Sequence, residues 1–508
     1  MCGFIGILGV EGGNVVRQIY DGLLAIQHRG QDAAGILTFD GSRFHLVKGA
    51  GLVRDIFNET NTAALKGDVG LGHVRYPTIG AGTEEDAQPF FMTAPYGVAM
   101  AHNGNVINYA ALKEDLHKRD HHHLNSCCDV EIILNVFARE LRKTGADVIT
   151  PDVVYRAVQS VFDRVEGSYS AVAYVIGGGL VAFRDPHGIK PIIMGERRVG
   201  DQVAYCVASE SVVLDMLDFH HTYNIEPGEV VFIDCNRQVH RKRLVEREHR
   251  PCIFEWIYFA RPDSFIDKIS VYKTRLRLGE HLGERWLAAG APKPDVVIPV
   301  PESARPAAIA MAKKLDVPYR EGLVKNRYIG RTFIMPGQVN RRLFVRQKLN
   351  AIKLEFQDKD VLLVDDSIVR GNTVKELIEI ARQAGARNVY FASYSAPLSY
   401  PCFYGIDMMT RGEFIARNRA VESIRQLIGA DYLLYQEVED MIRATREGNP
   451  DLQQFCTACF TGEYPTGPLP EALLEAIEKE RMIIQQEFAF EPRRVPDDHT
   501  LSLKEPSR

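Results

Sequence analysis

Residues 361–373 read VLLVDDSIVRGNT, and they indicate the architecture of the second half of the chain. The stretch opens with an uninterrupted apolar run, which is typical of a strand buried on both faces of a parallel sheet. Two adjacent carboxylates, Asp365 and Asp366, follow at once, and a small polar loop then leads into a helix that we expect to begin near Thr373. Because ligands of parallel sheets bind beyond the carboxyl ends of the strands, the stretch predicts a binding site as well as a strand.

The sequence around this stretch keeps alternating between strand and helix. Residues 295–299 and 388–393 are two further short apolar runs. Residues 374–381 place apolar side chains on one face of a helix, and Gly385 supplies its C-terminal stop. This alternation predicts an α/β domain with a parallel, doubly wound sheet.

Residues 2–235 have a different pattern of apolar residues. Short apolar runs such as 4–10 and 98–102 predict strands, and helical periodicity appears over 15–27 and 130–141. Strands that follow one another with few helices between them predict an α+β domain of layered, mostly antiparallel sheets.

The length of 508 residues allows two or three domains. We expect the first domain over 2–235, a mixed-charge connection over 236–255 and the second domain over 256–465. Residues 237–250 could be an exposed edge strand or part of that connection. A C-terminal helix and a loose polar tail are expected over 466–508.

Charge and hydropathy exclude several classes of partner. Lys plus Arg number 61 against 66 Asp plus Glu, a formal net charge of -5, which argues against a nucleic-acid partner. The stretch most like a membrane span, 167–183, is uncharged but contains three consecutive glycines and predicts two strands instead. Nine cysteines and no basic region ahead of the first apolar run predict reduced thiols in the cytoplasm.

Cys2 is the first candidate catalytic residue. If Met1 is removed, which a small second residue permits, Cys2 carries both a thiol and the α-amino group of the chain. An α-amine with a pKa of about 7.7–8 can act as a general base at neutral pH, and the thiol can then act as a nucleophile. A cysteine after the start codon is more often incidental, so this assignment depends on other polar residues of the domain.

Those polar residues suit the hydrolysis of glutamine. The reaction needs a clamp for the α-carboxylate, an acid group for the α-ammonium and donors for the oxyanion. Arg75 could grip the carboxylate and Asp129 could bind the ammonium. The side chain of Asn103 and the backbone N–H of Gly104 could stabilise the oxyanion.

The strings CGFIGI at 2–7, QHRGQD at 27–32 and HNGN at 102–105 resemble the glutamine amidotransferase domain of the N-terminal-nucleophile class. The resemblance implies a layered α-β-β-α fold with antiparallel sheets. It implies that Cys2 is the nucleophile, that Arg75 and Asp129 hold glutamine, and that Asn103 and Gly104 form the oxyanion hole.

Residues 121–128 contain three histidines and two cysteines that could be read as a metal site. The charged residues 118–120 before them favour a solvated loop, and their spacing matches no closed metal site. We therefore expect a loop here.

The 361–373 stretch resembles the phosphoribosyl diphosphate (PRPP) motif of type I phosphoribosyltransferases, and IPVPES at 298–303 resembles their pyrophosphate loop. Independently of the resemblance, the loop amides and the helix N-terminus form a nest for a phosphate. The resemblance implies that Asp365 and Asp366 contact the ribose and help Ser303 to place magnesium. The residues implied to bind PRPP through its 5′-phosphate are Ser367, Arg370, Gly371 and Thr373.

A basic run with an apolar centre occupies 324–348. Its cations, among them Lys325 and Arg331, could form a nucleic-acid patch or a solvated face. Beside a diphosphate site, we expect a closing loop in which these cations neutralise the leaving group and residues 333–335 exclude water.

The two domains in this order, with YFARPDS at 258–264, resemble the glutamine phosphoribosylpyrophosphate amidotransferases of de novo purine synthesis. The resemblance implies that ammonia released at Cys2 crosses a closed apolar passage to C1 of PRPP. The products would be 5-phosphoribosylamine, glutamate and pyrophosphate. It further implies a homodimer or homotetramer and feedback inhibition by purine nucleotides.

Four cysteines stand where iron–sulfur members of that family place ligands. Four thiolates suit a four-iron four-sulfur cluster, which we expect in a structural or oxygen-sensing role, and zinc is the alternative. The four residues are Cys252, Cys402, Cys456 and Cys459.

Two other functions compete with this one. A different amidotransferase, such as a glucosamine-6-phosphate or asparagine synthetase, would need an isomerase-type domain or an ATP pyrophosphatase loop instead of the Asp365–Asp366 motif. A regulator that merely binds PRPP would have no use for the set of glutaminase residues around Cys2.

Overall fold

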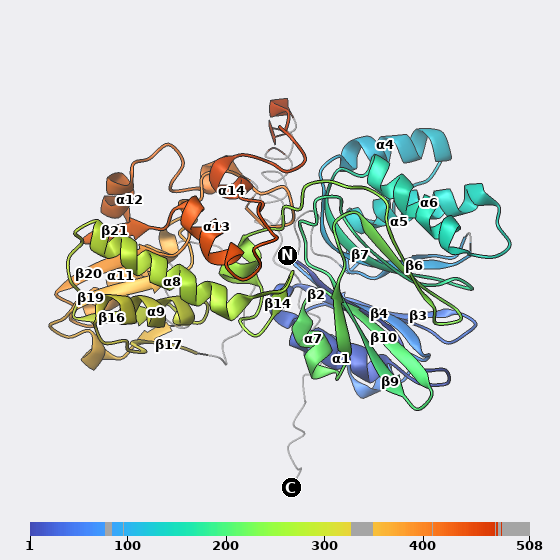
Figure 1. Cartoon of the computed structure of the whole chain (residues 1–508), viewed down its shortest axis with the longest axis horizontal. Coiled ribbons are helices and arrows are strands. Elements are labelled where there is room, and N and C mark those ends of the chain that lie inside the picture. Colours follow the sequence, from blue (N-terminus) through green and yellow to red (C-terminus); the bar gives the residue numbers. More distant parts are fainter. Residues whose placement is uncertain are drawn as a thin grey trace, which may run out of the picture.

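The computed structural model describes residues 1–76, 84–94, 96–326, 349–408, 410–472, 474–475 and 479. Figure 1 shows two lobes side by side, with the N-terminus between them. The described part of the chain contains no helix that is both long and apolar enough to cross a membrane. Arg331 and most of the expected closing loop and C-terminal helix lie outside the described residues.

The first lobe contains two antiparallel sheets. In spatial order, the seven-stranded sheet consists of β11 (His220–Asn224), β9 (Ile193–Val199), β10 (Gln202–Ala208), β1 (Gly3–Leu8), β4 (Val69–Arg75), β2 (Ala33–Phe39) and β3 (Phe44–Ala50). The six-stranded sheet consists of β13 (Val239–Arg243), β12 (Glu229–Asp234), β8 (Gly179–Arg184), β7 (Gly167–Val175), β6 (Val98–Val106) and β5 (Phe90–Met92). The strand β13, inside the expected connection, is an edge strand of this second sheet.

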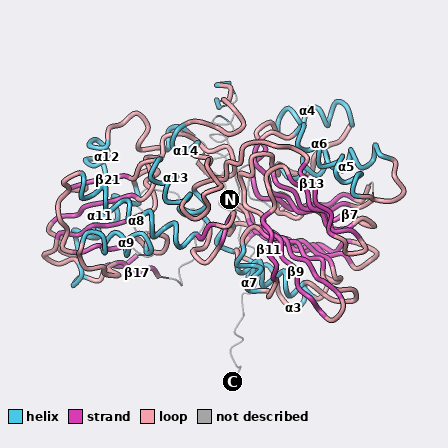
Figure 2. Tube along the Cα trace, in the orientation of Figure 1, coloured by secondary structure: helices cyan, strands magenta, loops and turns pink. Residues whose placement is uncertain are grey.

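The two sheets pack face to face and carry helices on their outer faces (Figure 2). Consecutive residues of β1 show why: Phe4 enters the core between the sheets, whereas Ile5 packs beneath α1 with Ile19. This confirms the α-β-β-α layering expected for the first domain. The helices are α1 (Val16–Ala25), η1 (Gln27–Arg29), α2 (Val53–Ile56), α3 (Glu59–Thr62), α4 (Tyr109–Asp120), α5 (Asp129–Thr144), α6 (Pro151–Arg164) and α7 (Ser211–Met216).

The second lobe is built on a parallel sheet, as predicted. Its strands, in spatial order, are β16 (Val296–Pro299), β19 (Asp360–Asp365), β20 (Asn388–Ser393) and β21 (Tyr432–Tyr435). Leu362 of β19 packs into the core beneath α8 and α9, whereas Leu363 packs on the opposite side beneath α11. Burial on both faces explains the uninterrupted apolar run in β19.

Helices cover both faces of this sheet (Figure 1). They are α8 (Val271–Ala288), α9 (Arg305–Leu315), α11 (Asn372–Gln383), α12 (Val421–Ile428) and α13 (Val438–Arg446). The remaining elements are the π-helical turn η2 (Glu255–Phe259), η3 (Lys353–Glu355), η4 (Arg411–Glu413), α14 (Ala458–Thr461), β14 (Phe265–Ile266), β15 (Ile269–Ser270), β17 (Leu323–Lys325) and β18 (Leu349–Ala351).

After β16 and after β19 the chain turns to opposite sides of the sheet. Val297 of β16 pairs with Leu362 of β19 on one side and bridges to Tyr319, which follows α9, on the other. After β19 the chain instead passes through α11 to β20, the neighbour of β19 on the far side from β16. The gap between β16 and β19 is therefore a topological switch point, where open α/β sheets bind ligands beyond the strand ends.

Candidate functional site

Cys2 lies directly before β1, a central strand of the seven-stranded sheet. Its side chain is buried, and its thiol approaches the carbonyl oxygen of Tyr76 at 3.5 Å. Its backbone N–H donates to Oδ1 of Asn103 at 3.1 Å. Since Asn103 belongs to β6, this hydrogen bond joins the two sheets of the first lobe at the predicted nucleophile.

Asn103 and Gly104 have the properties expected of an oxyanion site. The amide nitrogen Nδ2 of Asn103 is buried and has no hydrogen-bond partner among the described residues. A buried donor left unpaired costs about 1–3 kcal/mol, so it indicates a functional role. Gly104 has a φ of +156°, and a Cβ there would lie 1.9 Å from the carbonyl oxygen of Ser168, so only glycine fits.

Asp129 is the first residue of α5 and is buried. Its Oδ2 accepts the backbone N–H of Val106 at 3.0 Å and lies 3.4 Å from Nε2 of His102. Burial alone would raise the pKa of Asp129, but the charge and hydrogen bond of His102, the Val106 N–H and the charge of Arg75 lower it. Asp129 is therefore held as a carboxylate, the form that binds an ammonium.

The structure brings Arg75 into the same group. The thiol of Cys128 senses the charges of Arg75, Asp129 and Cys2, and burial is the main cause that raises its pKa to about 12. The predicted clamp, acid and nucleophile therefore all lie near this buried thiol, whose raised pKa keeps it neutral. Arg75 is itself buried and lies 3.5 Å from Asp86.

The sequence analysis missed three contributors to this site. Asp86 accepts the backbone N–H of Cys127 at 3.0 Å, and Gln88 Oε1 accepts the backbone N–H of His102 at 2.8 Å. Both lie in an irregular segment with no periodic signal. Arg29 stands in the QHRGQD string without an assigned role, although its Nε donates to the carbonyl oxygen of Cys2 at 3.0 Å.

A second group of predicted residues meets at the ends of β16 and β19. Ser303 Oγ donates to Oδ2 of Asp366 at 2.5 Å, and Ser367 Oγ donates to its Oδ1 at 2.6 Å. The backbone N–H of Asp366 donates to Oδ1 of Asp365 at 2.9 Å. The two loops that the sequence placed in one site therefore contact each other.

The two carboxyl groups suit a cation. Burial raises the pKa of Asp365 well above its usual value, and the charge of Asp366 acts in the same direction. Burial also raises the pKa of Asp366, although the hydroxyls of Ser303 and Ser367 oppose it. Two adjacent acids in this state gain stability when a divalent cation neutralises them, which fits magnesium with its preference for oxygen ligands.

The loop that follows ends at the N-terminus of α11. Gly371, with φ +79°, precedes that helix, and the helix begins at Asn372, one residue before the predicted start. Arg370 and Thr373 are exposed at this end of the sheet, as is Lys325 on β17. The exposed helix N-terminus offers unpaired N–H groups to an anion.

The four cysteines also come together. Cys252 and Cys456 lie on adjacent bridged segments, and the N–H of Ile253 donates to the carbonyl oxygen of Cys456 at 3.3 Å. All four side chains are buried in one core. Burial raises the pKa of Cys252 to about 11 and that of Cys459 well above its usual value, and the charges of neighbouring thiols, Cys402 among them, add to both shifts.

In the described part of the chain, no three His, Cys, Asp or Glu side chains converge closely enough to hold one metal ion. A zinc ion would need its sulfurs about 2.3 Å from a single point, and in a four-iron cluster each cysteine would bind a different iron.

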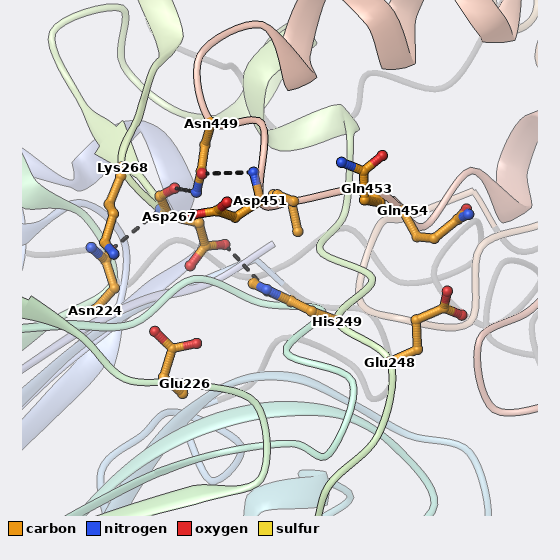
Figure 3. Close-up of a pocket in the computed structure, with 11 residues that line it drawn as sticks. Asn224, Glu226, Glu248, His249, Asp267, Lys268, Asn449, Asp451, Gln453 and Gln454 are labelled. Carbon is orange, nitrogen blue, oxygen red and sulfur yellow. Dashed lines mark hydrogen bonds and ion pairs between the residues drawn. The ribbon is translucent and has the colours of Figure 1, made fainter.

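Two cavities lie away from both groups. One, of about 350 Å³, opens at the seam between the lobes and is lined by Asp267, His249 and Asn449 among others (Figure 3). The other, of about 310 Å³, is lined by His121, His122 and His123, and His122 Nδ1 lies 2.8 Å from Oδ1 of Asn135.

Comparison with known families matches both lobes. Residues 73–216 match the model of the glutamine amidotransferase domain, and residues 276–399 match that of the phosphoribosyl transferase domain.

Relatives match over nearly the full length. The amidophosphoribosyltransferase of Pseudomonas aeruginosa is 49% identical over 95% of this chain and 96% of its own length. The Escherichia coli enzyme of the same name is 47% identical over 94% of this chain and 95% of its own length. The Schizosaccharomyces pombe enzyme is 44% identical over 93% of this chain and 92% of its own length.

Solved structures share the whole architecture. The glutamine phosphoribosylpyrophosphate amidotransferase of B. subtilis, complexed with ADP and GMP, has a TM-score of 0.81 at 36% identity. The alignment covers 92% of this chain and 98% of that chain.

Proposed function

This chain belongs to the amidophosphoribosyltransferase family, and from that premise we propose which of its residues carry out each half of the reaction. The family performs the first step of purine biosynthesis, a glutamine-dependent pentosyl transfer. Glutamine and PRPP are converted to 5-phosphoribosylamine, glutamate and pyrophosphate.

Cys2 performs glutamine hydrolysis. After removal of Met1, the free α-amine accepts the thiol proton, and Sγ attacks the amide carbon to form a tetrahedral intermediate. The N–H groups of Asn103 Nδ2 and Gly104 stabilise its oxyanion, and collapse releases ammonia and leaves a thioester that water hydrolyses to glutamate. The observation that carries this proposal is the unpaired Nδ2 of Asn103, whose Oδ1 is bonded to the nucleophile.

Arg75 and Asp129 hold the substrate. The guanidinium of Arg75 suits the α-carboxylate because it can donate two parallel hydrogen bonds. The lowered pKa of Asp129 keeps it ionised, so it can accept the α-ammonium.

Phosphoribosyl transfer takes place at the ends of β16 and β19. Asp365 and Asp366 accept hydrogen bonds from the ribose hydroxyls and, with Ser303, hold magnesium, which would neutralise charge on the pyrophosphate leaving group. The 5′-phosphate binds at the N-terminus of α11, to Ser367, Arg370, Gly371 and Thr373. Lys325, on β17, and Arg331 bind the pyrophosphate.

Ammonia passes between the centres inside the protein. Released to water at neutral pH, it would be mostly ammonium, which has no lone pair for attack on C1. The support is that η2 contacts both centres. At one end, Glu255 of η2 accepts a hydrogen bond from Arg29, which lies beside Cys2. Further along, the carbonyl oxygen of Ile257 accepts the hydroxyl of Tyr394, which lies beside Ser303.

Cys252, Cys402, Cys456 and Cys459 hold a four-iron four-sulfur cluster of structural or oxygen-sensing role. The support is the burial of the four thiols in one core and the bridge that sets Cys252 beside Cys456. We assign the domains as 2–235 and 256–465, followed by 466–508. They are joined by 236–255, of which β13 adds an edge strand to the first domain.

The proposed setting of the enzyme rests on composition and on relatives. Nine free cysteines suit the cytoplasm. Purine nucleotides act as feedback inhibitors, because the B. subtilis relative is complexed with ADP and GMP. The assembly is a homodimer or homotetramer.

The deciding experiment measures pyrophosphate release from PRPP with glutamine and then with ammonia. Cys2→Ala should abolish the glutamine-dependent rate and keep the ammonia-dependent rate. Cys235→Ala, which removes an exposed thiol elsewhere in the first lobe, should leave both rates unchanged. A Cys2→Ala enzyme that still used glutamine would refute the assignment.

A further inference from the structure

A buried arginine holds the backbone of the nucleophile. Arg29 Nε donates to the carbonyl oxygen of Cys2 at 3.0 Å, and the arginine side chain is fully buried. The guanidinium can hold the Cys2 backbone in place only if other residues hold the guanidinium itself, because a mobile guanidinium would let the nucleophile move.

Two carboxylates fix Arg29. Its Nη2 donates to both oxygens of Glu255 at 2.9 and 3.0 Å, and its Nη1 donates to Oε1 of Glu210. Burial alone would lower the pKa of Arg29, but the charges of Glu255 and Glu210 raise it above its usual value. The arginine therefore stays charged, and each buried carboxylate depends on it in turn.

The second half of the chain closes this network. Oε2 of Glu210 accepts the hydroxyl of Ser264 at 2.6 Å and the backbone N–H of Arg261 at 3.0 Å. Glu255, Arg261 and Ser264 all belong to residues 255–264, which lead from the first lobe into the second. Without this segment, Glu210 would be the one carboxylate left to Arg29 among the described residues, and Glu210 would lose two donors and keep Arg29 and His28 as partners.

The same segment is anchored to the transferase lobe. Arg275 of α8 donates to the carbonyl oxygens of Trp256 at 2.9 Å and Ala260 at 2.8 Å. The hydroxyl of Tyr394 lies 2.9 Å from the carbonyl oxygen of Ile257, to which it donates, and 3.2 Å from the backbone carbonyl oxygen of Ser303. Residues 255–264 are thus held on one side by the transferase centre and on the other by the neighbours of Cys2.

We propose that Glu255 and Ser264 are positioning residues for glutamine hydrolysis: through them the transferase half of the chain fixes Arg29, and through Arg29 the backbone of Cys2. Neither residue touches a substrate. Their effect is on the geometry of the nucleophile, where a displacement of about 1 Å lowers a rate by roughly 10²-fold. The inference rests on the proposed role of Cys2.

The test uses Glu255→Gln and Ser264→Ala in the full-length enzyme. Each should lower kcat for glutamine hydrolysis roughly tenfold, with KM for glutamine and the ammonia-dependent rate both within about twofold of the parent. The double variant should lose less than the product of the single losses, because both act through Arg29.

Asp263→Asn is the matched control. Asp263 lies in the same segment and pairs with Arg261, but its side chain is 55% exposed and makes no hydrogen bond or ion pair with Arg29, Glu210, Glu255 or Ser264 in the described structure, so both rates should stay unchanged.

An equal loss of the glutamine- and ammonia-dependent rates in both variants would show a merely structural role and overturn the proposal, as would an unchanged kcat for glutamine. If Glu255→Gln fails to fold, Ser264→Ala decides alone. The Cys2→Ala experiment reports separately on the nucleophile, so failure of that assignment cannot be confused with failure of the positioning role.

Discussion

Oδ1 of Asn103 accepts the backbone N–H of Cys2 at 3.1 Å, so the proposed oxyanion donor is fixed by the proposed nucleophile itself. The bond also sets the orientation of the side-chain amide, since the oxygen must face Cys2 and the nitrogen then remains unpaired. One hydrogen bond therefore prepares the donor before substrate arrives.

Asn103→Asp tests this donor. The variant keeps an oxygen for the Cys2 N–H, removes the Nδ2 donor and adds a charge that repels the oxyanion. We expect kcat for glutamine to fall by roughly 10²–10³, with little change in the ammonia-dependent rate. Steady-state kinetics with Asn236→Asp, an exposed turn position, as control would check it. A fall in both rates would point to damage beyond the glutaminase centre.

Asp365→Asn should make the protein more stable and less active. The pKa of Asp365 is raised in the folded state, so its ionised form is disfavoured there and destabilises the fold above the unfolded pKa of about 3.9. Removing the charge should add about 1 kcal/mol at pH 7.5, and the gain should vanish below pH ~4. Both pyrophosphate-releasing rates should fall together.

Asp360, at the other end of β19, is the matched control. It pairs with Arg387, whose hydrogen bond lowers its pKa. Asp360→Asn should therefore not stabilise the protein and should leave both rates unchanged. Thermal unfolding of the two variants at pH 7.5 and 4 compares them. Equal shifts in both would contradict the argument.

Asp267→Asn tests the ion pair that joins the lobes beside the cavity of Figure 3. Arg184 donates to the two oxygens of Asp267 at 2.7 and 2.9 Å, and both side chains are buried. Leaving Arg184 without its carboxylate should lower the free energy of unfolding by about 3–5 kcal/mol at pH 7. Urea unfolding measures the loss.

The pH dependence of that loss has a definite sign. Burial alone would raise the pKa of Asp267, but the charges of Arg184 and His249 lower it. The parent should therefore lose this contribution as the pH falls below about 4, and the gap between parent and variant should close. Asp21→Asn, which breaks the pair with the fully exposed Arg17, should leave the free energy of unfolding almost unchanged, because water screens such a pair. A gap independent of pH would argue against ionisation of Asp267.

Anaerobically purified protein should contain about four iron and four sulfide per chain and no stoichiometric zinc. Cys459→Ser should lose the metal. Cys206 is a buried cysteine of β10 in the first lobe, so Cys206→Ser should retain the metal. Iron, sulfide and zinc assays decide between cluster, zinc and free thiols.

Much of the fold could be predicted because its signals are local. The apolar run before Asp365 is a strand whatever surrounds it, and α11 starts within one residue of the predicted position. Candidate residues of each centre could be proposed from the sequence, since Cys2 directly precedes β1 and Ser303 and Asp366 lie in loops after strands. Asn103 and Gly104 lie within β6, which continues beyond the strand predicted over 98–102.

The sequence by itself determined the two lobes, their layers and the chemistry of each centre, because periodicity and motifs are written within short stretches of chain. Only the tertiary structure decided the partners. Arg29 meets Glu255 across 226 residues, and Ser264 meets Glu210 across 54. Such pairs depend on strand order and on how one lobe packs against the other. A buried charge needs a partner, but which residue becomes that partner is decided only when the folded chain brings the two side chains together.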